Sequence, residues 1–80
     1  MTSSDITSRV QEVFRKVLKD PDVVVHDTMS ADDHDAWDSL SHIHLIMEIE
    51  NAFSIRLKNS EVARLRNVGD LLGLVAKKTS

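Results

Sequence analysis

Apolar residues recur every three or four positions in the first part of the chain, which is the pattern of a helix with one buried face. These residues are Ile6, Val10, Val13, Phe14, Val17 and Leu18. The pattern predicts a helix from about residue 5 to residue 19, with Ser4 or a neighbour as its N-cap. Asp20-Pro21 ends this helix, because proline restricts the residue before it and cannot continue the helix.

Residues 20–38 form an unusually long connection, since loops beyond about 12–15 residues are uncommon in compact domains and are often functional. Val23, Val24 and Val25 could suggest a strand, but the sequence offers no second strand that could pair with them. We therefore expect the three valines to be loop residues that plug one end of a helical core.

Three further helical segments follow the long connection. The first runs from Asp38 or Ser39, either of which has the chemistry of an N-cap, to about Phe53. A short helix is expected over residues 60–65, and a last helix begins at Asn67, with Asp70 in a capping arrangement. The buried face of the last helix is expected to consist of Val68, Leu71, Leu72 and Val75. The pattern predicts an all-α four-helix bundle with a long loop between helices one and two and a short third helix.

The second helix carries two apolar faces when its residues are placed about 100° apart. The expected core face consists of Leu45, Ile46, Ile49, Ala52 and Phe53. Leu40, Ile43 and Met47 form a separate stripe, and Ser39 lies one turn before Ile43. The pattern leaves two roles open for this stripe, extra packing against the long loop or a surface for a partner.

Length and charge narrow the class of protein. At 80 residues we expect one domain over residues 1–80, with one small core and little room for a deep catalytic cleft. The net charge of -3 argues against a nucleic-acid binder, which needs a basic stripe to neutralise phosphates. Acidic residues instead cluster between Asp27 and Asp38, where they either attract a basic partner or form a solvated loop.

The absence of cysteine means that any thiol chemistry must use an imported thiol. The N-terminus lacks the basic start and the apolar run of a signal peptide, and no stretch reaches the roughly 18 apolar residues of a membrane span. We therefore expect a cytoplasmic protein that does not bind membranes, and we expect it to be a monomer.

Two catalytic or metal-binding interpretations are weak. Asp38, Ser39 and His42 superficially resemble a hydrolase triad, but a triad also needs an oxyanion hole and a substrate pocket, which a bundle of this size does not readily supply. His42 and His44 cannot share a metal ion, because residues two apart on a helix point about 200° away from each other. We expect no catalytic residue and no metal ligand, hence a protein that is not an enzyme.

The Asp38-Ser39-Leu40 motif opens the second helix and is followed by apolar positions that continue into the fourth. The matching positions are Ile43, Leu45, Ile46, Met47, Ile49-Glu50, Phe53, Ile55, Leu57 and Val68. With these positions the whole chain resembles the acyl carrier protein family. The resemblance implies that Ser39 carries a 4′-phosphopantetheine arm, which a phosphopantetheinyl transferase moves from coenzyme A in a magnesium-dependent reaction. It also implies that Asp38 is a recognition feature for that transferase.

The resemblance further implies what the arm does, since its terminal thiol would hold acyl or aminoacyl intermediates as thioesters between the acyl-loading and acyl-transfer enzymes of a biosynthetic pathway. The expected partner surface consists of Leu40, Ile43, Met47 and Glu48. Carriers of fatty-acid synthesis typically show an acidic second helix that basic patches on their enzymes recognise, but this chain has His42 and His44 there. Trp37 before the motif is similar to what occurs in specialised carriers, so we expect a specialised pathway of fatty-acid or secondary-metabolite type.

One alternative stays open. The chain could be a small helical protein-interaction module whose apolar stripe docks a partner helix and which carries no prosthetic group. In that case Ser39 would be only a helix cap. For Trp37, the alternative to a feature of specialised carriers is that it simply anchors the long loop on the core.

Overall fold

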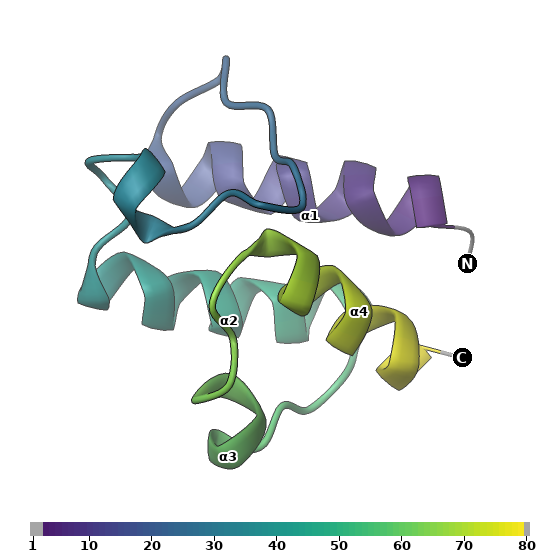
Figure 1. The fold of residues 1–80 in the computed structure, drawn as a ribbon. Coiled ribbons are helices and arrows are strands. Elements are labelled where there is room, and N and C mark those ends of the chain that lie inside the picture. Colours follow the sequence, from purple (N-terminus) through teal and green to yellow (C-terminus); the bar gives the residue numbers. More distant parts are fainter. Residues whose placement is uncertain (1–2, 80) are drawn as a thin grey trace.

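The computed structural model of the protein describes residues 3–79 and consists of four α-helices and one short 3-10 helix (Figure 1). The elements in chain order are α1 (Ser3–Leu18), η1 (Ala31–Asp33), α2 (Ser39–Phe53), α3 (Asn59–Val62) and α4 (Val68–Thr79). α1 and α2 lie side by side and run in opposite directions, and α4 packs against α1 (Figure 1). The all-α four-helix prediction, with its long first loop and short third helix, is confirmed.

The core is formed by the apolar faces that the sequence pattern predicts for the three long helices. Its buried helical residues are Ile6, Val10, Val13, Phe14, Val17 and Leu18 in α1, Leu45, Ile46, Ile49 and Phe53 in α2, and Val68, Leu71 and Val75 in α4. Two positions are less buried than predicted, since Ala52 is exposed and Leu72 is only half-buried. Both lie at the edge of their helical face, where solvent reaches the side chain.

The predicted boundaries of α1 are nearly correct. The helix ends at Leu18, one residue before the predicted end, and Lys19 takes up a left-handed conformation with φ of 55°. The Asp20 amide donates to the Arg15 carbonyl over 3.1 Å, as in a helix C-cap that turns the chain before proline. α1 already includes Ser4, so the N-cap that we expected near this serine lies outside the described residues.

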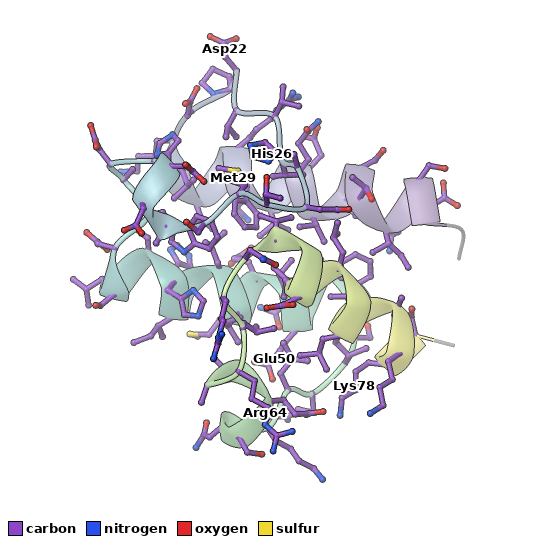
Figure 2. The ribbon with its side chains drawn as sticks, in the orientation of Figure 1. Asp22, His26, Met29, Glu50, Arg64 and Lys78 are labelled. Atoms are coloured by element: carbon purple, nitrogen blue, oxygen red, sulfur yellow. The ribbon has the colours of Figure 1, made fainter. Side chains whose placement is uncertain are left out.

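The long connection packs on α1 as a loop, as predicted. Val23 and Val25 are buried and Val24 between them is exposed, which is the alternation of an extended segment with one side on a core. Side chains of α1 satisfy the loop backbone in place of a second strand. Arg15 Nε donates to the Val23 carbonyl over 2.9 Å, and the Val25 amide donates to Gln11 Oε1 over 3.1 Å. Met29 continues the buried side of the loop (Figure 2).

The start of α4 is attached to this loop through backbone hydrogen bonds. The Val68 amide donates to the Met29 carbonyl and the Gly69 amide to the Asp27 carbonyl, each over 2.8 Å. These bonds satisfy two amides that the first turn of any helix leaves without an internal partner. A Cβ atom on Gly69 would lie 2.9 Å from the Asp27 carbonyl oxygen, so this close approach requires glycine.

We expect Gly69→Ala and Gly73→Ala to change stability in opposite directions. Gly69→Ala should lower the free energy of unfolding by about 1–3 kcal/mol, because the new methyl group displaces the Asp27 backbone. Gly73→Ala should raise it by up to about 1 kcal/mol, because nothing lies within 4 Å of the new methyl group and alanine favours helix. Urea denaturation measures both, and equal changes would contradict the structural role of Gly69.

The third helix is shorter than predicted. It spans Asn59–Val62 rather than residues 60–65, because Ala63 and Arg64 turn the chain so that Leu65 packs on the core. Glu61 fixes this short helix in place, since it accepts the Lys58 amide over 2.9 Å and pairs with Lys78 Nζ of α4 over 3.0 Å. These two contacts lower the pKa of Glu61.

Candidate functional site

The site is the start of α2, where the structure decides between the two candidate N-caps. Asp38 is the N-cap, with extended backbone angles and a carboxylate that accepts the Ser41 amide over 2.9 Å. Ser39 is therefore the first residue inside the helix. The hydrogen bond from the Ser41 amide lowers the pKa of Asp38, because it stabilises the charged form of the carboxylate.

The lowered pKa of Asp38 predicts a pH-dependent contribution to stability. We expect the wild type to be more stable than Asp38→Asn at neutral pH, since asparagine keeps a cap but not the charge. A carboxyl group with a lowered folded-state pKa stabilises the fold above its ordinary value of 3.8 and loses this effect as the pH falls through the folded-state pKa. Thermal unfolding of both proteins across acidic pH tests this, and a constant difference at every pH would contradict it.

Ser39 presents its hydroxyl to solvent. The residue is exposed, and within residues 3–79 its hydroxyl makes no hydrogen bond to another group. It therefore has no base of its own, and it needs an external enzyme to act as a nucleophile. The amides and the dipole at the start of the 15-residue helix α2 favour a negatively charged group at this place. An exposed hydroxyl at such a helix start fits the attachment of a phosphate ester.

Trp37 anchors the long loop beside Ser39. Its ring is buried and meets the ring of Phe14 edge-on, with 5.0 Å between the ring centroids. The indole nitrogen of Trp37 donates to His42 Nδ1 over 3.2 Å. Because Trp Nε1 can only donate, this bond requires an unprotonated His42 Nδ1. His42 is thus a half-buried partner of Trp37.

The groups around Ser39 do not assemble a hydrolase triad. The Asp38 carboxylate caps the helix backbone, His42 Nδ1 accepts from Trp37, and among the described residues no hydrogen bond connects either group to the Ser39 hydroxyl. In residues 3–79 no group of three or more histidine or acidic side chains is placed to hold a metal ion. None of the helices in that range combines the length and the apolar character that crossing a bilayer requires.

An apolar cavity of about 620 Å³ opens beside Ser39. Phe14, Trp37 and Leu45 line it from the core side, and Ser39 lies at its edge. Arg66 and Asn67, from the loop between α3 and α4, also line it. The sequence pattern does not predict that these two residues share a cavity with Ser39, and its one signal is the basic Arg64-Leu65-Arg66 segment.

The second apolar stripe of α2 faces solvent. Leu40 is 80% exposed, Ile43 59% and Met47 56%. This exposure is inconsistent with packing against the long loop, which would have buried these side chains, and the role as a partner surface stays a prediction. Glu48 beside the stripe is half-buried, and its carboxylate pairs with Lys16 over 3.0 Å and lies 3.8 Å from His44 Nε2.

Comparisons with known proteins agree with this site. A family model described as a phosphopantetheine attachment site matches residues 8–75. The acyl carrier protein of Thermosynechococcus vestitus is 32% identical over 81 residues, which cover 100% of this chain and 99% of that protein. The acyl carrier protein of Petrotoga mobilis is 30% identical over 79 residues, covering 98% and 92%. The solution structure of the holo acyl carrier protein of Geobacter metallireducens superposes with a TM-score of 0.85 at 43% identity, covering 90% of this chain and 83% of that one.

Proposed function

Since the chain belongs to the acyl carrier protein family, whose members are non-enzymatic carriers with a phosphopantetheine attachment site, we propose that Ser39 is the attachment residue of this protein. The observation that carries this proposal is the exposed and unbonded Ser39 hydroxyl at the start of α2, directly after the Asp38 cap. The test is the intact mass of the protein after incubation with coenzyme A, magnesium and a phosphopantetheinyl transferase.

In the attachment reaction the carrier contributes the Ser39 hydroxyl as the nucleophile. The Ser39 oxygen attacks the phosphorus that bears the pantetheine chain, a phosphodiester forms, and the pyrophosphate bond of coenzyme A breaks. Adenosine 3′,5′-bisphosphate leaves, and the serine proton passes to a base of the transferase. The start of α2 stabilises the charge of the new phosphodiester. Once attached, the arm supplies the thiol that this chain lacks, and the thiol holds acyl groups as thioesters.

We propose that partner enzymes dock on the exposed stripe of α2. This surface consists of Leu40, Ile43 and Met47, with Glu48 at its edge. The partners are the phosphopantetheinyl transferase, for which the Asp38 carboxylate is a recognition feature, and the enzymes that load and transfer the acyl group. Support comes from the exposure of three large apolar side chains in a row next to Ser39, since such patches on monomers commonly mark interaction sites.

The apolar cavity beside Ser39 is a suitable shelter for the apolar part of a carried acyl group. Its wall is formed by Phe14, Leu45, Ile46 and Leu71, and burying a methylene group there gains about 0.8 kcal/mol.

We propose that the whole chain acts as one acyl carrier domain and as a monomer. Its proposed location is the cytoplasm.

We also propose that the protein serves a specialised pathway. The first turn of α2 contains no acidic residue, so the helix lacks part of the charge that carriers of fatty-acid synthesis typically present. His42, at a position where a carboxylate or other polar residue is usual, is instead bonded to Trp37. The carried group itself could be acyl or aminoacyl.

A further inference from the structure

Charge is unevenly distributed about Ser39. Nine of the thirteen acidic residues precede Ser39, whereas six of the ten lysines and arginines follow it. In the folded protein the segments before and after α2 lie on different sides of this helix. The long loop with η1 lies on one side of α2, and α3 lies on the other (Figure 1). The exposed stripe Leu40, Ile43 and Met47 lies on the helix between them, so its two sides differ in charge.

The four carboxylates that follow Ser39 are all engaged in contacts within the protein. Glu48 pairs with Lys16, Glu50 accepts the Leu57 amide over 2.9 Å, Glu61 pairs with Lys78, and Asp70 accepts the Arg66 amide over 3.1 Å. Glu50 lies where α2 meets the segment that leads to α3 (Figure 2). This half of the surface therefore offers a basic partner little free negative charge.

Among the described residues none of the three arginines that follow Ser39 pairs with a carboxylate, and two of them, Arg56 and Arg66, line hollows next to the stripe. Arg66 lines the apolar cavity together with Ser39 and Ile43, and Arg56 lines a second depression, of about 430 Å³, together with Met47. Both side chains are exposed, and among the described residues no ion pair connects either guanidinium to a carboxylate, including Glu50, which lines the same depression as Arg56. Positive charge thus flanks both ends of the exposed stripe.

We propose that the acyl-loading and acyl-transfer enzymes that dock on this stripe present carboxylates to Arg56 and Arg66 around an apolar contact surface. The inference rests on the proposed function, since it assigns a charge to partners of the same surface. Arginine and carboxylate form paired hydrogen bonds with strong geometric preference, and complementary charge raises the rate of productive encounter. A partner with a basic docking patch would instead be repelled by the two guanidinium groups and would find Glu48 already paired with Lys16.

The test is a charge-swap experiment with a fatty-acid malonyltransferase whose carrier-docking patch is basic. The holo protein is first verified by mass, and malonyl loading is then measured at low salt. The double variant Arg56→Glu/Arg66→Glu should load at least about tenfold faster than wild type. The gain should shrink as salt screens the charges. A control, Lys19→Glu/Lys77→Glu, has the same net charge but changes exposed lysines outside the stripe, and should load like wild type.

The reciprocal experiment uses the same malonyltransferase with the charge of its docking patch reversed from basic to acidic. Wild type should load faster with this enzyme than with the original one, and the double arginine variant should lose that gain.

The proposal is overturned if no carrier variant is loaded, if the double variant gains nothing, or if the lysine control gains equally. It is also overturned if Arg66→Glu alone shifts the phosphorus resonance of the arm without changing loading, because Arg66 then binds the arm's phosphate. A wild type that is never converted to the holo form defeats the proposed function as well, whereas a properly formed holo protein without the charge effect defeats only this inference.

Discussion

Ser39→Ala is expected to abolish the attachment of phosphopantetheine completely, whereas wild type gains the mass of one such group per chain. The effect should be all-or-none, because the hydroxyl oxygen of Ser39 is the atom that forms the bond to phosphorus and alanine has no replacement for it. The measurement is intact-protein mass after incubation with coenzyme A, magnesium and a broad-specificity transferase. Alanine at the first position of α2 leaves the Asp38 cap in place, so the variant should remain folded.

A matched control separates loss of the attachment atom from loss of the fold. Ser60→Ala changes another exposed serine near a helix start, in α3, and should be modified like wild type. Circular dichroism of the Ser39→Ala protein should show unchanged helix content. Modification that survives Ser39→Ala would locate the arm elsewhere, and an unmodified wild type would favour the interaction module without a prosthetic group.

The second large effect concerns the two apolar faces of α2. Leu45→Ala and Phe53→Ala should each lower the free energy of unfolding by about 2–5 kcal/mol, because both side chains are buried and a cavity remains. Phe53→Ala also removes the ring over which the Arg9 guanidinium lies, 5.6 Å from the ring centroid. Ile43→Ala and Met47→Ala should change stability by less than about 0.5–1 kcal/mol, since these side chains are more than half exposed.

Urea denaturation measures the stability of the four variants, and acyl loading measures their function. The stripe variants should be loaded more slowly although they are as stable as wild type, because they remove apolar contacts with the partner. The core variants, measured at a temperature where they are folded, should keep most of the loading rate. If Ile43→Ala costs as much stability as Phe53→Ala, the stripe belongs to the core and the proposed docking surface is wrong.

Much of the fold could be predicted from the sequence because its signals are local. The spacing of apolar residues determines which face of α1 is buried, and the helix ends at Leu18, one residue before the end predicted from Asp20-Pro21. The same reasoning predicts a helix from Asp38 or Ser39 to about Phe53, and α2 spans Ser39–Phe53. Helix periodicity and capping depend on residues three or four apart, so they are visible without knowledge of the rest of the chain. The position of Ser39 at a helix start follows from this local pattern.

The remaining features of the site depend on residues that are distant in the sequence, and only the tertiary structure decides them. The pattern gives α2 two apolar faces, but α1 and the core cover only one of them, so Ile43 stays exposed. Glu48 has the sequence environment of a free surface carboxylate, yet the packing of α1 on α2 brings Lys16 to 3.0 Å from it. Arg66 lines the same cavity as Ser39 because the loop after α3 returns toward the start of α2. Helix formation depends on neighbouring residues, whereas exposure and charge pairing depend on which elements meet in space.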